Sequence, residues 1–214
     1  MNIIVAGIGT DVGKTVVSAI LCEGLKSQYW KPVQAGNLDN TDSDKLRNLV
    51  SYAGFHIHSE THTLTKPMSP HAAAAIDGVK ISANDFNKPD THGAPLVTEL
   101  AGGLMVPLSS TYLTIDLAAD LGGLVVLVVN SYLGSINHTL LSLDLLKTRG
   151  LPVAGLIFNG DINTDSRDVI LRYSGAHLIT EIPRAEKLDK AFIKIYANRI
   201  RDHKRLDHKR LACL

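Results

Sequence analysis

The stretch Gly7-Ile-Gly-Thr-Asp-Val-Gly-Lys14-Thr15 decides the fold of this chain. It follows a short apolar run at residues 2–6, and beyond it apolar residues recur at helical spacing as far as Leu25. A glycine-rich loop between a strand and a helix is the context that a phosphate-binding loop requires. There, backbone N–H groups turn toward an anion at the helix N-terminus, Lys14 neutralises the outer phosphates, and the Thr15 hydroxyl can ligate Mg²⁺.

The spacing of this loop differs from the common pattern. Five residues separate Gly7 from Gly13 where about four are usual, and Ile8 stands where the first glycine is expected. The alternative interpretation is a tight strand–helix turn that contains Gly-Lys-Thr by chance. The strand before the loop and the helix after it favour the phosphate loop.

The rest of the chain alternates short apolar runs with amphipathic segments. Further strands are predicted at residues 29–33, 96–100, 124–129, 153–158 and, more weakly, 177–182. Helices are predicted at about residues 42–52, 70–77, 112–121, 137–148, 164–174 and 186–201, and residues 54–95 are the least regular stretch. Strands that are apolar throughout are typical of a parallel sheet covered on both faces. We therefore predict an α/β fold with a doubly wound, mostly parallel sheet flanked by helices.

Charge divides the chain into a body and a tail. The 214 residues carry a formal net charge of +1, yet residues 199–210 hold six basic residues against two acidic ones. The sequence Asp-His-Lys-Arg-Leu occurs at 202–206 and again at 207–211. We predict a single domain at residues 1–198 and a basic tail at residues 199–214. The mildly acidic body has no broad basic face for nucleic acid.

Cysteine content and hydropathy bear on the cellular compartment. Cys22 and Cys213 are the only cysteines, so there is no disulfide framework. The longest apolar stretch, residues 121–129, is too short to span a bilayer. We expect a cytoplasmic protein with no membrane partner.

Two acidic positions are candidates for a magnesium nucleotide site. Glu99 ends an apolar run, so it lies where a buried strand delivers its carboxyl end, the edge at which open α/β sheets bind ligands. Asp42 and Asp44 lie in Asn40-Thr-Asp-Ser-Asp44, a cluster that is as typical of a helix cap as of a metal site. The residues alone leave this choice open.

Taken in order, the motifs of the chain resemble one family, the dethiobiotin synthetases, which are P-loop proteins with an extended phosphate loop. The resemblance runs from residue 5 to about residue 185 and rests on Thr10-x-Val12-Gly13-Lys14-Thr15, Lys31-Pro-Val-Gln-Ala-Gly36, Asn40-Thr-Asp42, Ser69-Pro-His71, Glu99-x-Ala-Gly-Gly103, Leu133-Gly-x-Ile-Asn137-His138, Asn159 and Ile182-Pro183. It implies a P-loop NTPase-like fold. It also implies an ATP- and Mg²⁺-dependent ligase, a homodimer, which joins 7,8-diaminononanoate and CO₂ or bicarbonate into the cyclic urea of dethiobiotin through a carbamate and a carbamic-phosphoric anhydride.

The same resemblance implies a role for individual residues. The catalytic set is Lys31, Lys14 and Thr10. The nucleotide-binding set is Asp11, Val12, Gly13, Lys14, Thr15, Val16, Glu99, Ala101, Gly102, Asn159, Pro183 and Arg184. The substrate-binding set is Thr10 and Lys31 with Gly134, Ser135, Ile136 and Asn137, the last four receiving the substrate carboxylate of the neighbouring subunit. The metal set is Thr15, Asp42 and Glu99, with Asp42 preferred to Asp44 by motif register.

Other interpretations remain open. A nucleotide-dependent switch ATPase of the partition or septum-positioning type would share the α/β core, but its signature lysine near the start of the phosphate loop has no counterpart in residues 7–11. His56, His58 and His62 are interpreted as part of a solvated loop rather than as metal ligands. His71 is a candidate for proton transfer, although Ser-Pro more simply begins a helix with proline at its first position.

Overall fold

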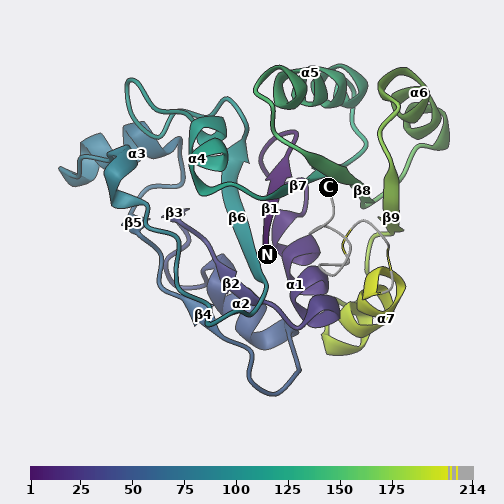
Figure 1. Ribbon diagram of the computed structural model, residues 1–214, viewed down its shortest axis with the longest axis horizontal. Helices are drawn as coiled ribbons and strands as arrows, with labels where there is room; N and C mark the ends of the chain where they lie inside the picture. Colours follow the sequence, from purple (N-terminus) through teal and green to yellow (C-terminus); the bar gives the residue numbers. More distant parts are fainter. Residues whose placement is uncertain (202, 204–205, 207–214) are drawn as a thin grey trace.

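Seven strands, all paired in parallel, form the central sheet of the part of the chain that the computed structural model describes, residues 1–201, 203 and 206 (Figure 1). Along the sheet their order is β4 (Ile57–His58), β2 (Gln28–Trp30), β6 (Leu96–Gly103), β1 (Asn2–Gly7), β7 (Leu124–Val129), β8 (Val153–Asn159) and β9 (Leu178–Ile182). On one side of β1 the chain forms β2, β4 and β6, with β6 inserted between β2 and β1, and on the other side it adds β7, β8 and β9 in order. The predicted doubly wound α/β fold is confirmed.

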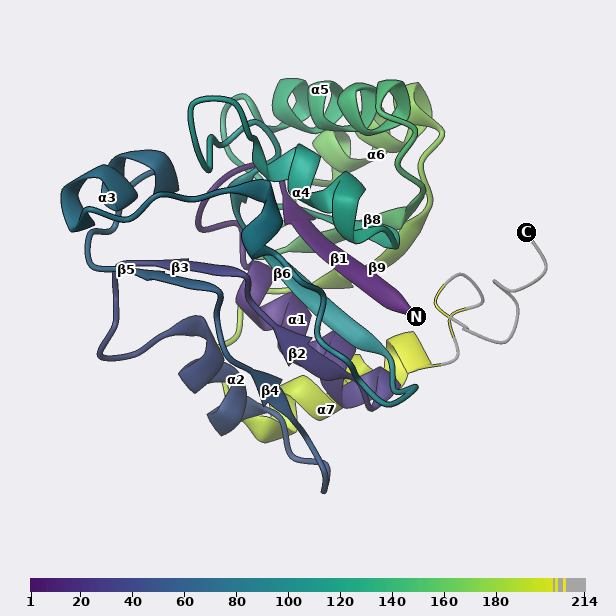
Figure 2. The same cartoon turned by 60° about the vertical axis from the view of Figure 1, so that its left-hand side comes forward.

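Helices cover both faces of the sheet (Figure 2). One face carries α1 (Lys14–Leu25), α2 (Asp42–Leu49) and α7 (Lys190–Arg201), and the other carries α4 (Thr114–Leu121), α5 (Ser135–Thr148) and α6 (Thr164–Ser174). A further helix, α3 (Pro70–Asp77), lies at one end of the molecule beside a small second sheet. The predicted helices are confirmed, each within a few residues of its predicted bounds. The double covering explains the continuous apolar strands, because the side chains of β1 and β7 that point to either face are almost all buried.

One predicted strand is wrong in its extent. Residues 29–33 do not form one strand, because the chain leaves β2 after Trp30 and enters a separate strand, β3 (Val33–Ala35). Pro32 stands between them, and it has no backbone N–H to give to a sheet. β3 pairs with β5 (His62–Leu64) in the two-stranded sheet. The break leaves Lys31 at the carboxyl end of β2.

The stretch at residues 54–95 is more regular than its composition indicates. It contains β4, β5, α3 and a short 3₁₀ helix, η1 (Ala83–Asp85). β4 and β5 were missed because strands of two or three residues are too short to give a period.

The C-terminal prediction is only partly within the described residues. Helix α7 continues as far as Arg201, whereas the repeated Asp-His-Lys-Arg-Leu segment lies outside the described residues apart from His203 and Leu206. The boundary between body and tail therefore stays a prediction. Among the described residues, no helix is both long enough and apolar enough to cross a membrane.

Candidate active site

The phosphate loop joins β1 to α1 at the carboxyl edge of the sheet. Gly13 adopts a φ of 93°, in the left-handed region that favours glycine. A Cβ at this position would lie 2.0 Å from Nδ2 of Asn159, which itself donates a hydrogen bond to the Val12 carbonyl at 3.1 Å. The end of β8 therefore holds the loop from the side, and the loop has no room for a side chain at Gly13.

Lys14 lies buried inside the curve of this loop. Its Nζ donates a hydrogen bond to the carbonyl of Gly9 at 2.8 Å. Burial lowers the pKa of Lys14 to about 8, although the nearby Glu99 carboxylate acts in the opposite direction. The ammonium is thus held where a bound anion can reach it.

A hydroxyl and two carboxylates meet beside the loop. The Thr15 Oγ1, in the first turn of α1, lies 2.9 Å from Asp42 Oδ1 and 3.1 Å from Glu99 Oε1, so its single proton can be donated to either carboxylate. Asp42 is the first residue of α2, and Glu99 lies in β6. An all-oxygen set of one hydroxyl and two carboxylates next to a phosphate loop fits Mg²⁺, which takes a few protein oxygens and completes its shell with phosphate and water.

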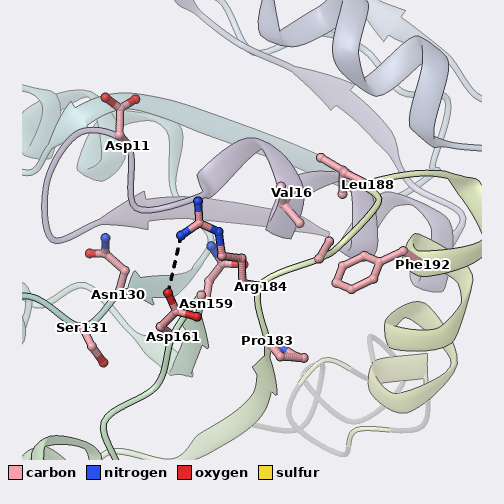
Figure 3. Close-up of a pocket in the computed structure, with 12 residues that line it drawn as sticks. Asp11, Val16, Asn130, Ser131, Asn159, Asp161, Pro183, Arg184, Leu188 and Phe192 are labelled. Carbon is pink, nitrogen blue, oxygen red and sulfur yellow. Dashed lines mark ion pairs between the residues drawn. The ribbon is translucent and has the colours of Figure 1, made fainter.

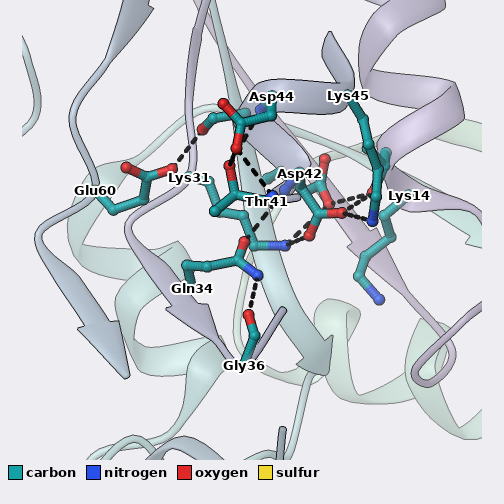
Figure 4. A network of polar contacts seen from close by, with 12 residues as sticks. Lys14, Lys31, Gln34, Gly36, Thr41, Asp42, Asp44, Lys45 and Glu60 are labelled. Carbon is teal, nitrogen blue, oxygen red and sulfur yellow. Dashed lines mark hydrogen bonds and ion pairs between the residues drawn. The ribbon is translucent and has the colours of Figure 1, made fainter. Parts of the chain in front are cut away.

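The two aspartates of the helix cap have separate partners. Thr41 caps α2, and Asp44 accepts hydrogen bonds from the backbone N–H of Thr41 at 3.0 Å and from its Oγ1 at 2.8 Å (Figure 4). Asp44 is therefore engaged in the capping box. Asp42 is left free to turn toward Thr15, which supports the choice of Asp42 over Asp44 as the candidate metal ligand.

Lys31 completes this cluster and is 6% exposed. Its Nζ pairs with Asp42 (Figure 4) and, at 3.2 Å, with Glu99 Oε1. Burial disfavours the charged ammonium, but the two carboxylates outweigh burial and raise the pKa of Lys31. For Asp42, burial is outweighed by Lys31, and the pKa falls to about 2. Lys31 and Asp42 therefore remain charged together over the whole neutral range.

Two further residues support the cluster and were not predicted. The Tyr29 hydroxyl donates to Glu99 Oε2 at 3.0 Å, and Lys45 pairs with Asp42 Oδ1 at 3.0 Å. Lys45 follows Asp42 by three residues on α2, a helical spacing that would have been enough to propose the pair. Tyr29 gives no such signal, because it reads as one more apolar residue of a buried strand.

Most of the predicted site residues line one cavity of about 650 Å³, which we call the phosphate-loop pocket. The predicted residues in its wall are Thr10, Asp11, Gly13, Lys14, Thr15, Val16, Lys31, Asp42, Glu99, Ala101 and Gly102. Gln34, Lys45, Met68 and Ser69 also line it and were not predicted. Val12 is buried and contributes its carbonyl to Asn159.

A second cavity of about 380 Å³, which we call the side pocket, is bordered by Asp11 of the phosphate loop and Val16 of α1 (Figure 3). The predicted residues Asn159, Pro183 and Arg184 line it. Arg184 forms an ion pair with Asp161, which also lines this pocket, at 3.5 Å (Figure 3). Its other walls come from Asn130, Ser131, Gly160, Asp161, Ala185, Leu188 and Phe192, which the sequence did not indicate.

One predicted group lies apart from both cavities. Gly134 to Asn137 form the start of α5, with Gly134 at a φ of 103°, and none of the four lines the phosphate-loop pocket or the side pocket. Within one chain, the structure does not bring these residues to Lys31.

Comparisons with known proteins bear on the family to which this chain belongs. A family model described as an AAA domain matches residues 1–191. The chain is 46% identical over 197 residues to the ATP-dependent dethiobiotin synthetase BioD of Christiangramia forsetii, covering 92% of this chain and 94% of that protein. It is 44% identical over 199 residues to the protein of the same name from Cytophaga hutchinsonii, covering 93% and 96%.

Solved structures of lower similarity share the fold. A plasmid partition protein of Borrelia burgdorferi matches with a TM-score of 0.54 at 14% identity, covering 93% of this chain and 95% of that one. The cell division ATPase MinD of Pyrococcus furiosus matches with a TM-score of 0.52 at 16% identity, covering 93% and 98%. At such low identity these likenesses concern the P-loop fold alone. The extensive identity to the curated relatives decides the family: this chain belongs to the dethiobiotin synthetases.

Proposed function

We propose that this chain is an ATP-dependent dethiobiotin synthetase that closes the cyclic urea of dethiobiotin from 7,8-diaminononanoate and CO₂. The observation that carries the proposal is the position of Lys31, a buried ammonium in the same pocket as the phosphate loop and the Thr15, Asp42 and Glu99 oxygens. Family membership supports the same reaction.

The reaction needs positioned charges more than it needs a protein nucleophile. One amine takes up CO₂ as a carbamate and loses a proton. A carbamate oxygen then attacks the γ-phosphorus of ATP, which releases ADP and leaves a carbamic-phosphoric anhydride. The second amine attacks the carbamate carbon, the bond to the phosphate oxygen breaks, and phosphate leaves. Positioning and charge neutralisation account for most catalysis of phosphoryl transfer.

The residues of the phosphate-loop pocket divide these tasks. Lys14 and the loop N–H groups hold the phosphates of ATP. Lys31 holds the carbamate and stabilises charge on the transferred phosphoryl group, and Thr10 lines the same pocket. Thr15, Asp42 and Glu99 are the residues that would hold Mg²⁺. Bound magnesium neutralises charge on the terminal phosphates.

The proposal includes a homodimer. Apolar side chains that a single chain leaves in solvent gather near α5: Leu133 is fully exposed, and Leu141 and Met105 are about 60% exposed. Leu141 and Met105 also border a cavity of about 420 Å³ between α5 and the loop after β6. A second copy would cover this surface and bring the start of its α5, a suitable site for an anion, to the substrate carboxylate. We place the enzyme in the cytoplasm and propose no nucleic-acid partner.

Phosphate release distinguishes the ligase from a switch ATPase. With Mg-ATP alone, we expect the enzyme to release little phosphate, because the attacking carbamate is absent. Adding 7,8-diaminononanoate and bicarbonate is expected to yield phosphate and dethiobiotin in equal amounts, measured by a coupled phosphate assay and mass spectrometry. Phosphate release that ignores the diamine, or that responds to DNA instead, would contradict the proposal.

The side pocket is proposed to hold the adenine base. We expect Asn159→Ala to raise the KM for ATP about tenfold, since it removes one amide from the pocket and one hydrogen bond from the loop, with a smaller effect on kcat. Asn87→Ala, at an exposed position outside both cavities, serves as the control. An unchanged KM for ATP would place the base elsewhere.

A further inference from the structure

Ser69 holds its hydroxyl in a position that helix capping does not explain. It is the N-cap residue of α3, and a serine there usually accepts a hydrogen bond from a backbone N–H of the first turn. Its side chain makes no such bond. Instead its Oγ lies 2.8 Å from Nδ1 of His71. The N-cap residues Thr41 and Asn163 do bond the backbone of their own helices, so Ser69 differs from them.

The Ser69 and His71 pair connects the phosphate-loop pocket with solvent. Ser69 lines that pocket together with Thr10 and Lys31, whereas His71 is exposed. The backbone N–H of His71 donates to the Pro107 carbonyl at 3.2 Å, which ties the start of α3 to the loop after β6. A proton that leaves the pocket through the hydroxyl would thus arrive at an imidazole in contact with water.

The reaction under the proposed function, on which this inference rests, needs such an exit. Alkyl amines are ammonium ions at neutral pH, so each amine must lose a proton before it attacks and another as its new bond to carbon forms. Two carboxylates of the pocket, the half-buried Asp42 and the buried Glu99, are already hydrogen-bonded to Lys31 and Thr15. The remaining carboxylate, Asp11, lies on the side of the pocket that borders the side pocket.

We propose that Ser69 and His71 form a proton relay for the substrate amines. The Ser69 oxygen accepts a proton from the substrate ammonium, whose electron pair stays on nitrogen, while the Ser69 O–H bond breaks and its proton moves to Nδ1 of His71. The imidazolium then releases a proton to water. In ring closure the nitrogen lone pair forms the bond to the carbamate carbon, phosphate departs with the electrons of the C–O bond, and the excess proton on nitrogen follows the same route.

Few other charged groups lie on the elements around His71. Neither β3 nor residues 104–113 contain any. Asp77, on α3 itself, accepts hydrogen bonds from Thr65, and His62, on β5, is paired with Asp85. Lys66 is exposed in the segment between β5 and α3. A change in the pH profile of turnover on replacing His71 would therefore report on His71 itself.

The test is the pH dependence of kcat for dethiobiotin formation in the wild type, His71→Gln and Ser69→Ala, from about pH 6 to about pH 9. We expect both variants to lose about a hundredfold in kcat near neutral pH, and to approach the wild type as pH rises and more free amine is present. Added imidazole is expected to restore part of the activity of His71→Ala, because the position is open to solvent. His92→Asn, an exposed residue with a positive φ that asparagine tolerates, is the matched control.

Several results would overturn the relay. One such result is a pH profile and a kcat in both variants that equal those of the wild type. Another is a higher KM for the diamine with unchanged kcat in the variants, because Ser69 and His71 would then only bind substrate. Failure of imidazole to restore any activity to His71→Ala would do the same. Ser69→Ala should keep the wild-type melting temperature, because its hydroxyl bonds no backbone group. Failure of the proposed function is distinguishable, because the wild type itself would then form no dethiobiotin.

Discussion

We expect Lys31→Met to reduce kcat for dethiobiotin formation by about two to three orders of magnitude, with the KM for ATP changed only a few fold. Methionine fills a similar volume without the charge. In the proposed mechanism the buried ammonium of Lys31 contacts the carbamate and the transferred phosphoryl group, whereas Lys14 and the loop N–H groups hold the phosphates of the nucleotide. The loss should therefore fall on the chemical step rather than on nucleotide binding.

Two further variants separate chemistry from folding. Lys31→Arg keeps the positive charge but replaces a compact ammonium with a planar guanidinium. We therefore expect its melting temperature to be closer to that of the wild type than its kcat is. Tyr29→Phe removes the hydroxyl that bonds Glu99 and leaves Lys31 in place, and it should lower kcat less than tenfold. Melting temperatures measured with and without Mg-ATP report whether each variant is folded. A folded Lys31→Met enzyme with kcat within tenfold of the wild type would contradict the assigned role.

The sequence predicts most of this fold because its information is local. Strands β1, β7 and β8 are mostly apolar runs, and the glycine-rich motif of the phosphate loop predicts the turn between β1 and α1. The course of the chain around Lys31 is not local. The break at Pro32 depends on β3 finding β5, about thirty residues further on, and β5 is only three residues long. Strands of three residues are too short to show a periodic pattern, so the sequence does not predict this pairing.

The candidate active site also contains some residues that the sequence predicts and others that only the fold brings together. Asp42 and Asp44 look equivalent in sequence, and they separate only because Thr41 and Asp44 bond each other in the capping box. The side pocket is still less predictable. Its walls at Asn130 and Phe192 come from the end of β7 and the start of α7, so their proximity follows from how the elements pack and from no motif. Motif register predicts the residues of the phosphate loop and the candidate metal ligands, whereas the other residues that line the two pockets can be identified only once the fold is known.

The second large effect is expected at the phosphate loop, where Gly13→Ala should weaken ATP binding by at least about a hundredfold. Two causes combine at this position. The backbone has a φ of 93°, which is unfavourable for any residue with a Cβ, and the new Cβ would come within 2.0 Å of Nδ2 of Asn159. Either the loop moves or Asn159 does, and each movement breaks the hydrogen bond from Asn159 to the Val12 carbonyl. Nucleotide affinity is measured by calorimetry or by a fluorescent nucleotide analogue.

Gly78→Ala separates these two causes. Gly78 also has a positive φ, 68°, but a Cβ there would meet no atom within 4 Å, and the residue ends α3 far from Asn159 in sequence. This control carries the backbone strain without the collision, so we expect it to cost about 1 kcal/mol of unfolding free energy and to leave the affinity for ATP unchanged. If Gly13→Ala were to bind ATP as tightly as the wild type does, the loop would have to tolerate a shift that breaks its contact with β8. The prediction that ATP binding requires the observed fit of the loop against Asn159 would then be wrong. If both variants lost affinity equally, the effect would come from general destabilisation and not from the fit between Gly13 and Asn159.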